Sequence, residues 1–276
     1  MRLDDAPESG NVADNRGMGT TFAVGGGGLL VLVLGLIFGV DLGGGNNPNP
    51  QPARNAPKDE KTLTFTKKIL GTTEKVWDEE FKKWGKKYVP PHLDLFSERV
   101  KTGCGTAPSA VGPFYCPADQ VVYIDPTFFD ELEQKLGGSK ADFSKAYVIA
   151  HEVGHHVQKL LGYSARVDSK RGTREEFDYS VRLELQADYL AGVWANKGHE
   201  KFKFIEPGDV ESAITTANAI GDDRLQQRSG GFVHPEKFTH GTSAQRVKWF
   251  KDGLATGDAS PQKLNRFFEA TSSKDL

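Results

Sequence analysis

The five residues from 151 to 155 carry the clearest chemical signal in the sequence. They read His-Glu-Val-Gly-His. On a helix, histidines four positions apart project from one face with their Cβ atoms about 5–6 Å apart, so both imidazoles can bind one zinc ion. Glu152 is turned about 100° from His151 and can reach a water molecule on the metal. We therefore predict that His151 and His155 bind zinc and that Glu152 is the catalytic general base.

A catalytic zinc ion usually has three protein ligands and one open position, so the chain must supply a third donor. The strongest candidates are Glu184 and Asp188, which lie four residues apart in a helical pattern from about 177 to 196. Both carboxylates can share one face of that helix. We predict that Glu184 binds the metal and that Asp188 accepts a hydrogen bond from the outer N–H of a ligand histidine, which fixes its tautomer.

Other choices for the third ligand have less support. The metzincin pattern requires Gly at position 158 and His at 161, where this chain has Gln and Leu. His156 points away from the ligand face of the helix and is expected to pack or to support the site from behind. Glu175 and Glu176 remain alternatives, but they belong to a charged stretch that is typical of a solvated loop.

The segment 141–161 has the pattern of a helix that can carry the zinc motif. Apolar residues recur at intervals of three or four, Ser139 is a candidate N-cap and Gly162 a candidate stop. The run 120–125 predicts a strand, either inside a sheet or at the edge where an extended substrate could pair with it. Further helices are predicted over 72–88, 209–227 and 243–253 and from Pro261 onward.

The zinc motif and the later ELQAD segment together resemble the gluzincin class of zinc peptidases, in which a Glu four residues before an Asp is the third ligand. More narrowly, the chain resembles the bacterial family described as "putative neutral zinc metallopeptidase". Its membrane-anchored members share segments like GPFYCPADQVVYID, HEVGHHVQ, LELQADYLAGVW and FTHGTSAQR. The resemblance implies an α+β, mainly helical zincin-like domain with a small sheet, a Zn²⁺ cofactor and a protein or peptide substrate.

The segment FTHGTSAQR adds a residue that could take part in catalysis. Thr242 and Gln245 form a capping box that starts a helix, so His240 lies in the loop just before it. The segment is similar to a gluzincin element, which places His240 near the zinc as an oxyanion donor and Arg246 in support. Gly241 stands where that element usually has Pro. A histidine in a surface loop is the alternative.

Charge and cysteine content narrow the class of protein. The chain has 35 Lys and Arg against 37 Asp and Glu, a formal net charge of −2, so we expect no nucleic-acid partner. Its two cysteines, Cys104 and Cys116, lie close together in the sequence. In a domain outside the cytoplasm we expect them to form a disulfide, and two buried free thiols are the alternative.

The first 60 residues divide into three predicted zones. Residues 1–18 are polar and acidic, which predicts disorder. Residues 19–40 carry no charge and are long enough for one transmembrane helix, although the run Gly25–Gly28 disfavours a helix. Residues 41–60 predict a flexible linker, and 61–276 the catalytic domain. The expected protein crosses the bacterial inner (cytoplasmic) membrane once, with its catalytic domain on the periplasmic or extracytoplasmic side.

These features predict a membrane-anchored zinc metalloendopeptidase. A zinc-activated water, with Glu152 as general base, would hydrolyse peptide bonds. One alternative is a catalytically silent zinc-binding membrane scaffold, in which Glu152 would be dispensable. The other is a zinc hydrolase of a non-peptide substrate, for which we expect a narrow pocket in place of a long substrate groove.

Overall fold

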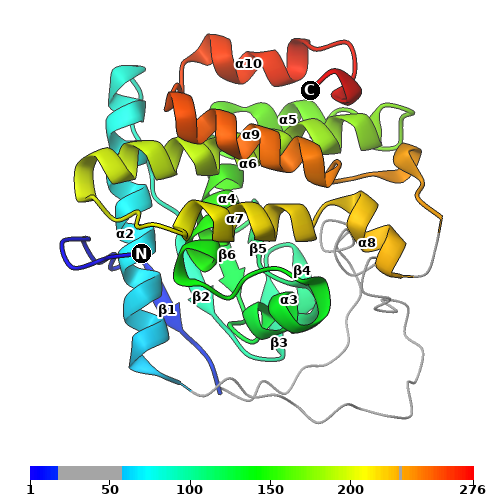
Figure 1. The fold of residues 1–276 in the computed structure, drawn as a ribbon. Coiled ribbons are helices and arrows are strands. Elements are labelled where there is room, and N and C mark those ends of the chain that lie inside the picture. The colour runs from blue at the N-terminus through cyan, green and yellow to red at the C-terminus, as the bar shows by residue number, and fades with distance from the viewer. Residues whose placement is uncertain (18–57, 230–231) are drawn as a thin grey trace, which may run out of the picture.

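The computed structural model describes residues 1–17, 58–229 and 232–276, and it shows a mainly helical molecule with a small mixed sheet. The α-helices of these residues are α2 (Glu60–Lys83), α3 (Phe128–Leu136), α4 (Asp142–Leu161), α5 (Tyr163–Asp168), α6 (Glu176–Phe202), α7 (Asp209–Ala219), α8 (Asp222–Arg228), α9 (Ser243–Thr256) and α10 (Pro261–Glu269). Helices α9 and α10 lie at the end of the molecule opposite the strands (Figure 1). The α+β, mainly helical part of the predicted fold is thus confirmed.

The four-stranded sheet has the order β1 (Val12–Asp14), β2 (His92–Leu95), β6 (Val121–Ile124), β5 (Phe114–Cys116). β1, β2 and β6 run parallel, and β5 runs antiparallel to β6. The predicted strand over 120–125 is β6, and it lies inside the sheet, so the hypothesis that it forms the substrate-binding edge is wrong. The edge strand that contacts α4 is β5.

A hairpin of β3 (Arg99–Thr102) and β4 (Gly105–Pro108) precedes the edge strand. The predicted disulfide is present and joins Cys104 in the hairpin turn to Cys116 in β5. Around it, the buried side chains of Phe96, Cys116 and Tyr123 form a small cluster separate from the main core. The edge strand is therefore held by a covalent link and by a local apolar cluster.

Helices α6 and α9 pack closely because glycines on each face the backbone of the other. A Cβ on Gly192 would lie 2.2 Å from the carbonyl oxygen of Phe250, and a Cβ on Gly253 would lie 2.1 Å from that of Tyr189. Any side chain at either position would push the two helices apart, since a folded interior has little room to yield.

The predicted helices are largely present, with some boundaries changed. Helix α4 begins at Asp142 with Ala141 as its N-cap, so the predicted cap by Ser139 is wrong; the Ser139 hydroxyl instead accepts a hydrogen bond from the amide of Ala141. The helix predicted over 209–227 is divided into α7 and α8. The break lies at Gly221, where a Cβ would lie 2.3 Å from the backbone nitrogen of Ser243.

The predicted transmembrane helix at 19–40 and the linker up to residue 57 lie outside the described residues. None of the helices that the structure describes combines the length and the apolar character that a membrane crossing requires. The long helices α2, α4 and α6 all carry acidic and basic residues. The fold class is therefore corrected: the described part is a mainly helical α+β domain in which the predicted membrane helix is not seen.

The N-terminal residues pack on the domain. Strand β1 pairs with β2, and the side chains of Ser9 and Asn11 donate hydrogen bonds of 2.6 and 2.7 Å to Glu74 Oε1 on α2. The structure thus corrects the prediction that residues 1–18 are disordered, because residues 1–17 occupy defined positions. The side chains of Ser9, Asn11, Asn15 and Arg16 bind partners on the domain surface.

The same segment is also linked to Asp59, the N-cap of α2. The buried guanidinium of Arg16 forms ion pairs with Asp14 at 2.7 Å and with Asp59 at 3.0 Å. The residues just before and just after 18–57 therefore lie side by side.

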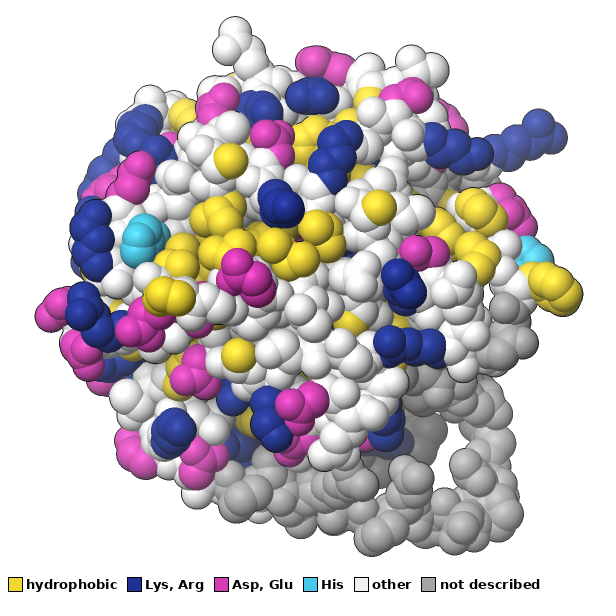
Figure 2. Space-filling view, in the orientation of Figure 1, with side chains coloured by type: hydrophobic (Ala, Val, Ile, Leu, Met, Phe, Trp, Pro, Cys, Tyr) yellow, Lys and Arg dark blue, Asp and Glu magenta, His cyan; other side chains and the backbone are white. Residues whose placement is uncertain are grey.

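The surface shown in Figure 2 has the same orientation as Figure 1. Over the described part of that face, acidic and basic side chains are interspersed, and apolar side chains gather near its centre. The distribution on this face agrees with the nearly balanced charge of the whole sequence.

Docking of the N-terminal segment can be tested at Gly71 on α2, where a Cβ would lie 2.2 Å from the carbonyl oxygen of Pro7. In a helix, alanine is more favourable than glycine by about 1 kcal/mol, so the substitution would stabilise α2 if the added Cβ met nothing. A net loss of stability would therefore show that the Cβ collides with the backbone of Pro7. We expect Gly71→Ala to lower the free energy of unfolding by about 1–3 kcal/mol and to speed amide hydrogen exchange in β1. Gly10→Ala is the control, because a Cβ there meets nothing within 4 Å. Unchanged stability and exchange in Gly71→Ala would contradict the docking.

Candidate metal centre

The close approach of α4 to α6 positions the metal-binding side chains. A Cβ on Gly154 would lie 3.2 Å from the carbonyl oxygen of Ala187, so small residues on both helices let the two backbones come together. His151 and His155 on α4 then meet Glu184 on α6 across this contact.

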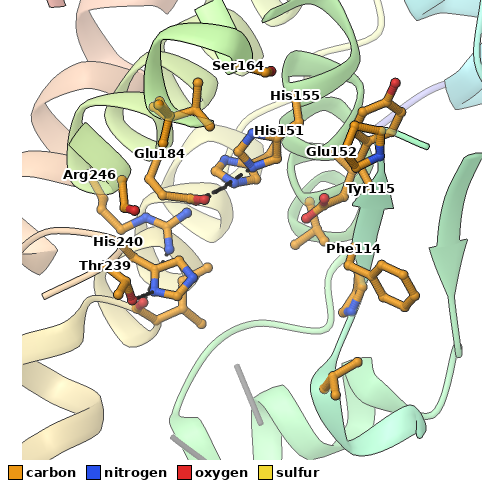
Figure 3. A pocket seen from close by; sticks show the side chains of 18 of the residues that line it. Phe114, Tyr115, His151, Glu152, His155, Ser164, Glu184, Thr239, His240 and Arg246 are labelled. Carbon is orange, nitrogen blue, oxygen red and sulfur yellow. Dashed lines mark hydrogen bonds and ion pairs between the residues drawn. The ribbon is translucent and has the colours of Figure 1, made fainter. Parts of the chain in front are cut away.

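His151, His155 and Glu184 bring together three donor atoms that all lie within 4.8 Å of one another. His151 Nε2 is 3.1 Å from Glu184 Oε2, and His155 Nε2 is 3.4 Å from Glu184 Oε1 (Figure 3). Two ligands bound at about 2.0–2.1 Å in a tetrahedron lie about 3.3 Å apart, and imidazole and carboxylate are donors that zinc prefers. The donor set and its spacing therefore fit a zinc ion.

Asp188 holds the outer nitrogen of His151, as the sequence predicted. Its Oδ1 lies 2.9 Å from His151 Nδ1, so Nδ1 donates and Nε2 faces the metal position. Arg246 on α9 contacts both oxygens of Asp188, at 2.8 and 3.0 Å, and the Tyr147 hydroxyl donates to Oδ1 at 2.5 Å. Burial alone would raise the pKa of Asp188, but the charges of Arg246 and His151 outweigh it and lower this pKa to about 2.

Gln158 holds the outer nitrogen of His155, as Asp188 holds that of His151. Sequence reasoning missed this residue. Its Oε1 lies 2.8 Å from His155 Nδ1. Its amide nitrogen donates to the carbonyl oxygen of Leu183 at 2.6 Å and to Gln186 Oε1 at 3.0 Å, which fixes the orientation of the amide. The sequence signal was its place three residues after His155 on the same helix face. Both ligand histidines thus have an oxygen acceptor behind them.

Glu152 is buried beside the three donors, on the side of α4 that faces β5. Burial raises the pKa of its carboxyl group, against the opposing effects of His155, His151 and a hydrogen bond from the backbone N–H of Tyr115. A carboxyl group whose pKa is raised toward the working pH is suited to taking up and returning a proton.

His240 lines the same cavity and is buried, so the surface-loop alternative is wrong. The predicted capping box of Thr242 and Gln245 is present at the start of α9. Asp222 holds the loop, because one of its oxygens accepts hydrogen bonds from the amides of Thr239, His240 and Gly241 and the other lies 3.1 Å from His240 Nδ1. Sequence reasoning missed Asp222, which no spacing rule connects to His240.

The alternative third ligands, His156, Glu175 and Glu176, do not lie among the three donor side chains. His156 is buried between Tyr115 and Val89, and burial lowers its pKa to about 4. Glu175 pairs with Lys170, and Glu176 accepts a hydrogen bond from the amide of residue 172. None of these three candidate ligands belongs to the cluster of donors in the described residues.

One cavity of about 540 Å³ contains the three donors, Glu152, His240 and Arg246. In Figure 3, Ser164 and His240 lie on opposite sides of the donors. The wall of the cavity includes apolar side chains from α3, α4 and the region of α8, namely Phe128, Leu136, Val148, Ile220 and Leu225. It also includes polar side chains from α5 to the start of α6, namely Asp168, Arg171, Glu176 and Ser180.

The sequence model of the family described as "Putative neutral zinc metallopeptidase" matches residues 1–267. The chain belongs to this family. The family description supports zinc as the metal and a hydrolase that acts on proteins or peptides. It agrees with the donor set of the site.

Two relatives show the extent of the similarity. "Uncharacterized protein YpfJ" of Escherichia coli (strain K12) is 46% identical over 287 residues, which cover 97% of this chain and 99% of that protein. "Uncharacterized protein Rv2575" of Mycobacterium tuberculosis (strain ATCC 25618 / H37Rv) is 47% identical over 180 residues, which cover 62% of this chain and 61% of that protein. No solved structure matches the chain.

The role of Gln158 leads to a prediction about metal affinity. Gln158→Leu removes the acceptor for His155 Nδ1–H at nearly constant volume, so the imidazole loses its fixed tautomer and orientation. We expect zinc affinity to fall by about 10–100-fold, measured by competition with a chromogenic chelator. Gln134→Leu, an exposed position on α3, is the matched control. Wild-type affinity in Gln158→Leu would show that the amide does not support the ligand.

Proposed function

We propose that this chain is a zinc-dependent endopeptidase that cleaves peptide bonds within extended segments of its substrate. The observation that carries the proposal is the convergence of His151, His155 and Glu184 with the carboxylate of Glu152 in one cavity. The family match supports the same class of reaction.

In the proposed mechanism, His151, His155 and Glu184 hold the ion. Zinc, when bound, would polarise the scissile carbonyl group and make the attacking water more acidic. Glu152 takes a proton from that water and later gives it to the leaving amine. Burial disfavours the charged ring of His240, but the carboxylates of Asp222 and Glu184 outweigh this effect and raise its pKa. The protonated ring can donate through Nδ1 to Asp222 and through Nε2 to the oxyanion that develops on the substrate.

A peptide substrate is supported by the edge strand beside the metal centre. Phe114 and Tyr115 of β5 line the cavity, and an edge strand can pair with an extended peptide through backbone hydrogen bonds. A hydrolase of small molecules needs no such edge. A silent zinc-binding scaffold needs no buried carboxylate beside the ligands, so Glu152 argues against that alternative.

The test of the mechanism is Glu152→Gln, which keeps the size and polarity of the side chain but cannot accept a proton. We expect one zinc per chain and a decrease in the rate of casein cleavage by a factor of at least about 10²–10⁴. Removing zinc with a chelator should abolish cleavage by the wild-type chain, and added zinc should restore it.

Glu200→Gln on the exposed side of α6 is the matched control and should cleave normally. Normal cleavage by Glu152→Gln would refute the proposed mechanism. Zinc binding with no cleavage of casein or of a peptide library by the wild-type chain would favour the silent scaffold.

The apolar part of the cavity wall suggests which peptide bonds are cleaved. Leu136, Val148 and Leu225 are almost fully buried, and the side chain of a substrate residue next to the scissile bond can enter the space that they border. A large apolar side chain there removes its own surface and that of the wall from water, whereas a charged one would lose its hydration.

We therefore expect peptides with Leu or Phe next to the cleaved bond to be hydrolysed about 10–200-fold more efficiently than peptides with Ala there. Leu225→Ala should shift the preference from Leu toward Phe, because it enlarges the pocket. The preference is measured as the ratio of kcat/KM for two peptides on one enzyme preparation. This ratio does not depend on the fraction of enzyme molecules that are active. A preference for charged side chains, or an unchanged ratio in Leu225→Ala, would contradict the assignment of the pocket.

A further inference from the structure

Helix α4 presents two neighbouring rows of side chains to different parts of the molecule. His151 and His155 contact Glu184 on α6. Glu152 and His156 are also four residues apart, and both contact Tyr115 on the edge strand β5. The proposed mechanism uses the first row and Glu152, whereas the fully buried His156 takes no part in it.

The contacts of His156 show which of its ring nitrogens carries the hydrogen. His156 Nε2 lies 2.7 Å from the carbonyl oxygen of Val89, and Nδ1 lies 2.9 Å from the Tyr115 hydroxyl. A carbonyl oxygen only accepts hydrogen bonds, so Nε2 carries the hydrogen and donates. Nδ1 of the neutral ring then accepts from the Tyr115 hydroxyl. The two rings also meet edge to face, with centroids 5.4 Å apart.

Tyr115 therefore meets α4 at two points one helical turn apart. Its hydroxyl donates to His156, and its backbone lies beside the carboxylate of Glu152 (Figure 3). The side chain of Lys159 makes a third contact, to the carbonyl oxygen of Pro117, through a flexible chain. The hydrogen bond to His156 fixes the position of β5 along the helix, beside the Glu152 carboxylate.

We propose that His156 and Tyr115 are positioning residues that hold the Glu152 carboxylate and the peptide-binding edge β5 in register with the metal ligands. Loss of the Tyr115 hydroxyl leaves Nδ1 of the buried His156 without a partner, and loss of His156 removes the acceptor of the half-buried Tyr115. Either change frees β5 to shift along α4. The metal ligands belong to the other row, so the zinc site is expected to survive. The catalytic consequence rests on the proposed function, but the attachment itself does not.

The experiment compares His156→Leu and Tyr115→Phe with His156→Gln. The Gln side chain can donate to Val89 and accept from Tyr115, so it should restore the attachment. In the first two variants we expect faster amide hydrogen exchange at position 115, one zinc per chain, and a kcat on a casein-derived peptide that is lower by about 10–100-fold. His156→Gln should stay close to wild type in all three measurements. Ile69→Val, a substitution of a buried residue on α2, controls for a general loss of stability.

Each outcome bears on the proposal. Wild-type exchange at Tyr115 in His156→Leu, or a failure of His156→Gln to restore exchange and kcat, would overturn it. Loss of zinc in parallel with kcat would also overturn it, because the role would then be structural. If His156→Leu turns over normally while Glu152→Gln does not, the positioning role fails and the proposed function stands. If Glu152→Gln is active, the proposed function fails, and the exchange measurement still decides the attachment.

Discussion

The contact between α4 and α6 at Gly154 is the constraint on which the rest of the site depends. The backbones approach closely because Gly154 has no side chain and Ala187 has a small one. With a larger residue at either place, His151 and His155 would move away from Glu184, and separations of 3.1 and 3.4 Å could not be kept. A packing detail of the core therefore sets the dimensions of the metal centre.

The site and the core also share one network of buried charge. Asp188 on α6 is surrounded by Tyr147 and His151 from α4 and by Arg246 from α9. Asp188 and Arg246 are both almost completely buried, so removing either would leave an uncompensated charge in the interior. The same carboxylate thus orients a metal ligand and joins three helices. Stability and metal binding are expected to depend on it together.

Helical spacing made part of this site predictable from the sequence. His151 and His155 are four residues apart, and so are Glu184 and Asp188. Because residues four apart on a helix share one face, this spacing predicted the three ligands and the role of Asp188. Gln158 follows the same rule but was not considered as a partner of His155. Asp222 and the edge position of β5 depend on which segments meet in the folded chain, and no local pattern encodes that. The three-residue strand β1 is too short to show a periodic signal, so the N-terminal segment looked disordered.

The glycine contact between α6 and α9 limits how this protein can change during evolution. Because backbone meets backbone at Gly192 and Gly253, neither helix can tilt or slide to adjust the cavity. Arg246 and Glu184, which those helices carry, therefore belong to a rigid frame. The freedom to acquire a different substrate range lies in the walls formed by α3, α5 and the start of α6, where side chains can be exchanged while the frame is retained.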